Sequence, residues 1–336
     1  MRHLRLILLS ILLVLGTLAA CGIADNNENV NNNDNNNIEE NVNENNEENN
    51  EENEASDEVE YPVTVTDGFG EEFTMEEEPK TIVSLMPSNT EIAYALDLGE
   101  KMVAGSDHDN YPEEALELEK VGGMELNIEA ILALEPDLVL AHPGNDPDAI
   151  EQLEDSDLAV YVVQDATNFD EVYESIEAVA QITGSAAKGE EIIETMQADL
   201  EEIVETAESI EEDDMKTVYI EISPEPEIYT PGKGTFEDDI LSLINAVNGA
   251  ADEDGWVMIS EEAVIEMNPD VIIATYDYVE DIEEGIMSRD GWGDITAVQD
   301  EAVVVVDTDL VSRPGPRLVE GALELAKAIY PDVFNE

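Results

Sequence analysis

The sequence predicts an α/β protein built from two pseudo-duplicated lobes, each with a mostly parallel sheet, joined by a long connecting helix. Strands and helices alternate along the body, as in parallel sheets covered by helices. One pattern also occurs twice, as "NIEAILALEPDLVLA" at 127–141 and "SEEAVIEMNPDVIIA" at 260–274, at a constant offset of 133 residues. Between the copies, apolar residues from Ile193 to Ala207 recur at helical spacing. We therefore expect one fold present twice, with a ligand cleft between the lobes.

The first 20 residues predict a lipoprotein signal peptide. Arg2 and Arg5 precede an apolar run that starts at Leu6, and small residues follow before Cys21. The Leu-Ala-Ala-Cys sequence at this point resembles the lipobox of bacterial lipoproteins, in which the cysteine becomes the lipidated first residue. Cys21 is the only cysteine, so a monomer has no disulfide. An uncleaved anchor helix is the alternative, and either reading places the body on the outer face of the cell membrane.

Residues 21–60 predict a disordered tether, because the stretch after Cys21 is nearly all Asn and Glu. The acidity continues into the body, and the whole chain has 84 acidic against 12 basic residues and a formal charge of −72. Such a surface repels nucleic acid and anionic membranes, so we expect neither as a partner. We interpret the charge as an adaptation of an external protein to a salt-rich or alkaline habitat.

The body divides into an N-terminal α/β lobe at 61–166, connecting helices at 167–213 and a C-terminal α/β lobe at 214–336. A hairpin is expected around Asp67-Gly68, and Gly184 divides the connecting helices. The strands expected in the sheets are 81–86, 102–106, 137–141, 159–163, 217–222, 270–276 and 302–307.

Side-chain caps set the expected helix starts. Ser88 or Asn89 should cap a helix that Gly99 closes, while Asn127 and Ser260 should cap the helices of the repeated pattern. Further helices are expected from about Asp146, over 235–247 and over 316–330.

Several spaced motifs together resemble a known family. They are "VSLMPSNTEIAYAL", "NIEAILALEPDLVLA", "GKGTFEDDILSL", "SEEAVIEMNPDVII" and "DLVSRPGPRLVEG". They are similar to the helical-backbone substrate-binding proteins of ABC importers for cobalamin, ferric siderophores and haem, and most similar to the vitamin B12-binding branch. The resemblance covers the chain from about Tyr61 to Pro331. It implies a monomeric, extracytoplasmic binding protein without a cofactor of its own, which delivers its ligand to a permease dimer with a cytoplasmic ATPase.

The resemblance assigns a role to Glu129 and Glu262, which the repeat aligns. In such proteins an acidic residue near the start of equivalent helices meets arginines of the two-fold symmetric permease. A symmetric dimer presents the same patch twice, so a pseudo-duplicated partner can contact both copies, and carboxylate–arginine pairs give register as well as attraction. Taken alone, both residues could simply stabilise helix N-termini.

Ligand contacts are expected in the loops that follow the strands. Trp256, Asp309 and Arg313 match the cobalamin branch directly, whereas His108, Met124 and His142 stand where larger aromatics are common. The full set of expected ligand-binding residues is His108, Tyr111, Met124, His142, Tyr229, Trp256, Tyr276, Asp309 and Arg313.

Other functions stay open at this point. An axial histidine, His108 or His142, would suit a haem carrier, and a ferric siderophore would need cleft cations such as Arg313 or Lys233. No dedicated metal-ion site is expected with so few histidines. An enzyme is not expected, because the chain has no G-x-S-x-G elbow, Walker loop or G-x-G-x-x-G after a strand. A surface-anchored hydrolase and an adhesin or structural lipoprotein are the remote alternatives.

Overall fold

The computed structural model describes residues 59–335 of the chain. The expected signal peptide at 1–20, the lipidation site Cys21 and nearly all of the expected tether at 21–60 lie outside the described residues. Within the described part, no helix is both long and apolar enough to cross a membrane.

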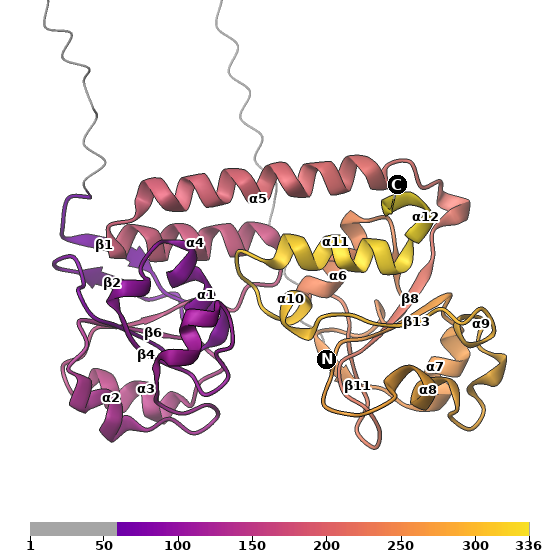
Figure 1. Cartoon of the computed structure of the whole chain (residues 1–336), viewed down its shortest axis with the longest axis horizontal. Coiled ribbons are helices and arrows are strands. Elements are labelled where there is room, and N and C mark those ends of the chain that lie inside the picture. Colours follow the sequence, from indigo (N-terminus) through magenta and orange to yellow (C-terminus); the bar gives the residue numbers. More distant parts are fainter. Residues whose placement is uncertain (1–58, 336) are drawn as a thin grey trace, which may run out of the picture. The chain divides into compact units, whose positions relative to one another are not determined.

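The N-terminal lobe is built on a five-stranded sheet with the order β5-β4-β3-β6-β7, in which all neighbours are parallel (Figure 1). An antiparallel hairpin of β1 and β2 precedes it. Four strands of this sheet, β3, β4, β6 and β7, are short and almost entirely buried, which is typical of a parallel sheet covered by helices, whereas the edge strand β5 is a short charged pair. The strands are β1 (Val63–Thr66), β2 (Glu72–Met75), β3 (Ile82–Ser84), β4 (Met102–Gly105), β5 (Glu119–Lys120), β6 (Leu138–Ala141) and β7 (Val160–Val162).

Successive side chains along these strands pack against different helices. Ile82 and Leu138 belong to the cluster that contains α1 (Pro87–Ala95) and α4 (Phe169–Thr183). Val83 and Val139 belong to the cluster that contains α2 (Ile128–Leu134) and α3 (Pro147–Glu154). The sheet is therefore sandwiched between two helical layers.

The C-terminal lobe repeats this plan on a four-stranded sheet with the order β10-β8-β12-β13. One face packs against α6 (Phe236–Leu243) and α11 (Leu318–Ile329), the other against α7 (Glu261–Met267) and α8 (Ile282–Met287). A separate antiparallel pair, β9 and β11, has no counterpart in the sequence-based expectation. The strands are β8 (Thr217–Glu221), β9 (Tyr229–Pro231), β10 (Val247–Asn248), β11 (Trp256–Met258), β12 (Val271–Ala274) and β13 (Val303–Val305).

The repeated pattern forms the same local structure in both lobes. Asn127 and Ser260 accept hydrogen bonds from the backbone N–H groups of Ala130 and Ala263, so both expected caps are confirmed. Each helix has seven residues, and each ends on a residue with a left-handed backbone, Glu135 or Asn268. Such a residue ends a helix sharply, so the chain turns at the same point in both copies.

The Pro-Asp pair that follows each of these helices fixes the start of the central strand. The Asp137 carboxylate accepts from the backbone N–H groups of Lys80 and Thr81, just before β3. The Asp270 carboxylate accepts from the N–H of Thr217, the first residue of β8. The repeat is therefore a helix–strand joint that appears once in each lobe.

Two helices connect the lobes, and Gly184, with φ +79°, separates them as the sequence predicts. The second, α5 (Ala186–Ala207), has 22 residues and therefore extends about 33 Å. It runs over α4 on one side and α11 on the other (Figure 1). Helix α5 thus contacts α4, which packs against the N-terminal sheet, and α11 of the C-terminal lobe.

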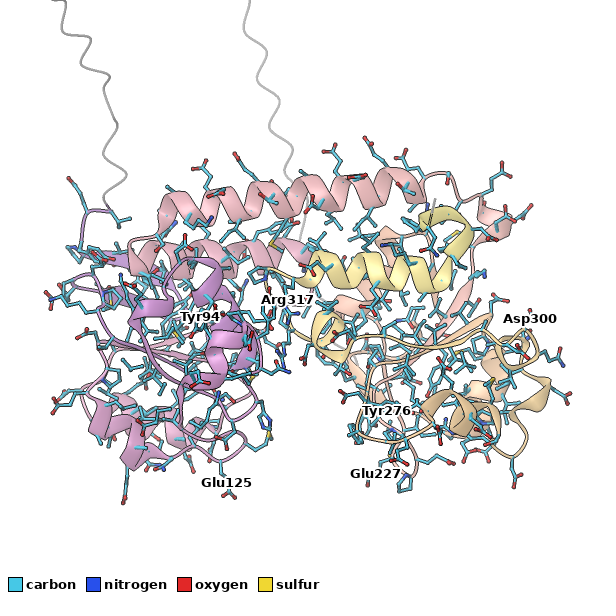
Figure 2. All side chains as sticks on the ribbon, viewed as in Figure 1. Tyr94, Glu125, Glu227, Tyr276, Asp300 and Arg317 are labelled. Atoms are coloured by element: carbon cyan, nitrogen blue, oxygen red, sulfur yellow. The ribbon has the colours of Figure 1, made fainter. Side chains whose placement is uncertain are left out.

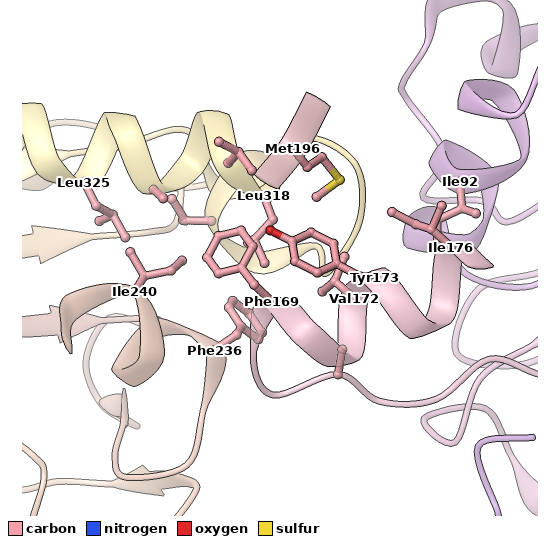
Figure 3. Close-up of a cluster of buried hydrophobic side chains, with 14 of the residues drawn as sticks. Ile92, Phe169, Val172, Tyr173, Ile176, Met196, Phe236, Ile240, Leu318 and Leu325 are labelled. Carbon is pink, nitrogen blue, oxygen red and sulfur yellow. The ribbon is translucent and has the colours of Figure 1, made fainter. Parts of the chain in front are cut away.

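One continuous hydrophobic cluster also crosses between the lobes (Figure 3). In the centre, Phe169 and Tyr173 of α4 lie beside Phe236 of α6 and Leu318 of α11. Leu325 of α11 lies toward one end of the cluster and Ile92 of α1 toward the opposite end. Opening the lobes at this point would expose apolar surface, at about 25 cal/mol per Å². The shared core therefore resists a wide hinge motion.

Three expected helix boundaries were wrong. Gly99 does not close α1, which ends at Ala95, and Gly99 instead begins a 3₁₀ turn. Helix α1 begins at Pro87, and its N-cap is Met86, which makes no side-chain cap. Proline is pre-organised for the first helical position, so the helix starts at Pro87 and Asn89 lies inside the first turn. There the Asn89 side-chain amide donates to the Ala141 carbonyl of β6. Helix α6 ends at Leu243 rather than near 247, because Asn245 has a φ of +54°.

Several short elements complete the described chain. They are α9 (Thr296–Gln299), α10 (Thr308–Ser312), α12 (Pro331–Phe334) and the 3₁₀ turns Gly99–Lys101, Glu113–Glu117, Glu212–Asp214 and Trp292–Asp294.

Candidate ligand-binding cleft

A cavity of about 570 Å³ lies between the two lobes. Its N-terminal wall comes from the start of α1 and from loops that follow β4, β6 and β7, which is where ligands bind in open α/β sheets. Its C-terminal wall comes from the first turn of α6, from β11 and from α10. The lining residues are Met86, Pro87, Ser88, His108, His142, Asp165, Ile222, Phe236, Glu237, Trp256, Thr275, Thr308, Asp309, Ser312, Arg313 and Pro314.

Five of the nine expected ligand-binding residues line this cavity. His108 and His142 come from the N-terminal lobe, and Trp256, Asp309 and Arg313 come from the C-terminal lobe. The structure thus brings together residues that are separated by as much as 205 positions in the sequence, from His108 to Arg313.

The other four expected residues lie elsewhere. Tyr111 stacks on Arg317, with the guanidinium carbon 3.7 Å from the ring centre, and lines a second cavity. Met124 is 84% exposed, and Tyr229 is on β9. Tyr276 is buried, and its hydroxyl donates to Glu221 at 2.6 Å beneath the cavity wall. These four side chains do not share the cavity in this structure.

A buried glutamate of the N-terminal lobe joins the lobes. Glu91 on α1 is only 3% exposed. Its Oε1 accepts from Arg313 Nη1 at 2.9 Å and from Arg317 Nη2 at 2.7 Å, and its Oε2 accepts from Arg317 Nε at 2.8 Å. Figure 2 shows Arg317 at the boundary between the lobes. Paired, charge-assisted bonds of this kind are the strong ones, so Glu91 fixes both arginines across the boundary.

Both arginines have further partners. Arg313 Nη2 lies 2.6 Å from the Asp309 carboxylate, and the Asn110 side chain bridges the same two residues. The hydrogen bond from Arg317 to Glu91 raises the pKa of Arg317 above its usual value, although burial opposes this effect. We refer to Glu91, Asn110, Asp309, Arg313 and Arg317 as the interlobe ion cluster.

The cavity wall is rich in carboxyl groups. Asp165, Glu237 and Asp309 all line it, and Arg313 is the one Lys or Arg among its lining residues within the described chain. Since Arg313 is already paired with Glu91 and Asp309, no net positive charge faces the cavity. Burial raises the pKa of the Glu237 carboxyl to about 7.

His142 is held in one tautomer. Its Nδ1 accepts a hydrogen bond from the Gly144 N–H at 3.0 Å, and its Nε2 lies 3.6 Å from the Asp165 carboxylate. Burial lowers the pKa of His142, and the nearby Asp165 only partly opposes this. The ring is therefore neutral at pH 7, and its Nε2 carries the proton. The described residues contain no group of three or more side chains suited to hold a metal ion.

Glu129 and Glu262 are exposed residues in the first turns of α2 and α7. They occupy the same position of equivalent helices, one in each lobe. Figure 1 shows these two helices on the side of the lobes remote from α5. A partner that approaches this side could contact both.

Three residues that line the cavity or join the lobes were not predicted from the sequence. They are Glu91, Asp165 and Glu237. Asp165 is the second residue after an expected strand, a signal close to the one that pointed to His142. Glu91 lies beside Ile92 and Ala93 in an apolar stretch, and this is a signal of burial. Glu237 looks like an ordinary first-turn acid, and only the fold shows that it is buried.

Replacing Glu237 with glutamine is expected to remove a pH-dependent part of the stability. The carboxyl pKa is 4.5 in the reference state and about 7 in the fold, so the folded state holds the proton more tightly. The contribution of Glu237 to stability is thus fully present below pH 4.5 and is lost as the pH rises to about 7. The unfolding free energy of E237Q minus that of the parent protein should increase by about 3 kcal/mol over this range.

Urea unfolding at constant high salt and a series of pH values measures this difference. Glu266→Gln, which removes an exposed carboxyl of the same lobe, is the matched control. A difference between E237Q and the parent that does not vary with pH would contradict the assignment.

Comparisons with known proteins agree with this architecture. Residues 82–310 match the periplasmic binding protein family. The chain is 48% identical over 279 residues to an ABC transporter substrate-binding lipoprotein of Bacillus subtilis, covering 82% of this chain and 88% of that protein. It is 33% identical over 250 residues to the vitamin B12-binding protein of Vibrio cholerae, covering 71% of this chain and 85% of that protein.

A solved structure has the same fold. The crystal structure of a possible iron-binding, periplasmic solute-binding protein from Staphylococcus epidermidis superposes with a TM-score of 0.69 at 35% identity. The match covers 76% of this chain and 100% of that one. These relatives are solute-binding proteins and not enzymes. The chain belongs to the periplasmic binding protein family, as a substrate-binding protein of an ABC transporter of the cobalamin, haem and siderophore group.

Proposed function

We propose that the protein captures a cobalamin or related corrinoid outside the cell and delivers it to the permease of an ABC importer. The ligand would occupy the cavity between the lobes, in contact with His108, His142, Trp256, Asp309 and Arg313. The similarity to the vitamin B12-binding protein of Vibrio cholerae supports this ligand class.

The charge of the cavity favours a corrinoid over an anionic ligand. Arg313 and Arg317 are both occupied by the buried Glu91, and three carboxyl groups line the cavity. Ferric siderophores and the propionates of haem are anionic and would need unpaired cations, because an unpaired buried charge is costly. A corrinoid has uncharged carboxamides around its ring, so it does not require them.

The histidine geometry favours the same choice. In the neutral His142 ring, Nδ1 already accepts a backbone N–H and Nε2 carries the proton. Neither nitrogen has a free lone pair for axial ligation of haem iron.

An iron complex is the second candidate ligand. The similar Staphylococcus epidermidis structure is described as a possible iron-binding protein, and the exposed His108 also lines the cavity. A siderophore or haem would then bind in the same place.

The proposal includes the place of the protein in the cell. The Bacillus subtilis relative is a lipoprotein, and Cys21 follows small residues after an apolar run. We propose lipidation at Cys21 and anchoring to the outer face of the cell membrane through this lipid, with the ABC permease and its ATPase as partners.

A ligand titration tests the proposal. Isothermal titration of the purified protein in high salt with cyanocobalamin, aquacobalamin, haem and several ferric siderophores should give tight, saturable binding of the corrinoids alone. Tight binding of haem or a siderophore without corrinoid binding would establish the second candidate instead. Absence of binding by the whole panel would contradict both.

Replacing Trp256 with alanine is expected to weaken corrinoid binding by tenfold or more, which corresponds to a loss of about 1.4 kcal/mol. The indole lines the cavity, and a ring stacked on a flat ligand contributes about 0.5–1.5 kcal/mol beyond its buried area. Tyr229→Ala is the matched control, since Tyr229 is 38% exposed and Trp256 40%, and the two lie on paired strands, but only Trp256 lines the cavity. Equal losses in both variants would count against this position of the ligand.

A further inference from the structure

Glu237 combines deep burial with an unused hydrogen-bonding atom at the cavity wall. It is only 3% exposed and lines the cavity from the first turn of α6. Its Oε1 accepts a long hydrogen bond from the Trp256 indole N–H at 3.5 Å. Its Oε2 is buried and has no hydrogen-bond partner. Buried polar atoms almost always have a partner, so this oxygen indicates a group that the protein itself does not supply.

The surroundings show which kind of group is missing. Burial raises the pKa of Glu237, hydrogen bonding to the carboxyl opposes this only in part, and no cation contributes. Arg313, which lines the same cavity, is bound to Glu91 and Asp309. A bound ligand can supply the partner of Oε2, either as a donor to the carboxylate or as an acceptor from the carboxyl when it is protonated.

A primary carboxamide satisfies this carboxyl group better than a carboxylate or an apolar group does. Its N–H donates to a carboxyl oxygen, and its C=O accepts from the same carboxyl when that group is protonated. Above the pKa of Glu237, which is about 7, a ligand carboxylate at this place would oppose Glu237 with a like charge in a buried site, which is strongly unfavourable.

We propose that Glu237, with Trp256 beside it, forms a subsite for one peripheral carboxamide of the ligand and discriminates against a carboxylate at that position. This inference rests on the proposed corrinoid function. It adds a specificity-determining residue, because the intact amide and its hydrolysed form differ by one charge at one place on the ring.

The test uses cyanocobalamin and its separate monocarboxylic acids, in each of which one peripheral amide is hydrolysed. Affinities are measured by calorimetry at pH 8 for the parent protein, Glu237→Gln and Asp165→Asn. Glutamine keeps the shape of glutamate and removes its charge. Asp165→Asn removes another carboxyl group of the same cavity and controls for the general negative field.

We expect one acid isomer to bind the parent protein at least tenfold more weakly than cyanocobalamin does. In E237Q the ratio of the cyanocobalamin affinity to the affinity for this isomer should fall to below threefold. In D165N the same ratio should stay within twofold of the parent value. Thermal melts check that both variants are folded.

The outcomes separate this inference from the proposed function. If the parent protein binds cyanocobalamin but E237Q changes no ratio, the subsite is wrong and the corrinoid function stands. If E237Q and D165N both strengthen the binding of every acid isomer by the same factor, the discrimination comes from the overall charge of the cavity, and the subsite is again wrong. If no corrinoid binds, both proposals are wrong.

Discussion

Replacing both Glu129 and Glu262 with lysine is expected to abolish ligand uptake by cells while leaving ligand affinity unchanged. The two residues are exposed at matching positions of α2 and α7, and neither lines the cavity. A pseudo-duplicated surface fits a two-fold symmetric permease. In the docking that the family resemblance implies, lysines would stand opposite permease arginines and place like charges together, at a cost of several kcal/mol. Each single substitution should reduce uptake about tenfold or more without abolishing it, because one of the two contacts remains.

Uptake of a radiolabelled ligand by cells with the cognate permease measures this effect, and calorimetry measures binding separately. The matched control is E151K with E283K, which makes the same charge change at one exposed residue of each lobe. Normal uptake by the E129K/E262K variant would refute the docking role. Equal loss in the control would assign the effect to net charge alone.

The local joints of the fold could be predicted from the sequence because their signals are local. Asn127 and Ser260 are polar residues directly before apolar helical patterns, and both form the expected caps. The cap of α1 was missed because two cap-type residues, Ser88 and Asn89, compete there with Pro87. Proline sets the start of the helix, and the Asn89 amide then bonds to a neighbouring strand, which no local pattern indicates.

A place just after a strand predicted the cavity residues only in part. His142 directly follows β6 and lines the cavity, but Tyr276, two residues after β12, is buried against Glu221. The spacing of residues along a strand indicates which face of the sheet a side chain is on, but not how deeply that side chain is buried. Glu91 and Arg313 are 222 residues apart in the sequence, so their pairing depends on how the lobes meet.

Replacing Glu91 with glutamine is expected to lower the unfolding free energy by about 3–5 kcal/mol, the usual cost of removing one partner from a buried ion pair. The Glu91 carboxylate accepts three hydrogen bonds from Arg313 and Arg317, both of which are largely buried. Glutamine cannot neutralise Arg317, and it leaves Arg313 to the partly exposed Asp309. The loss should therefore appear as a lower urea midpoint with an unchanged m-value.

A compensating variant shows whether unpaired charge is the cause. Removing the charges of Glu91, Arg313 and Arg317 together, as E91M with R313M and R317M, replaces three buried ions with apolar groups of similar size, a change that is often neutral or stabilising. Asp309 keeps its charge in this variant, but its side chain is partly exposed and still accepts from Asn110. The triple variant should therefore recover most of the stability that E91Q loses. An E91Q loss below about 0.5 kcal/mol would place the cluster among solvent-screened ion pairs, which contribute little. A triple variant as unstable as E91Q would instead mean that the interlobe hydrogen bonds themselves, rather than charge balance, hold α1 to the C-terminal lobe.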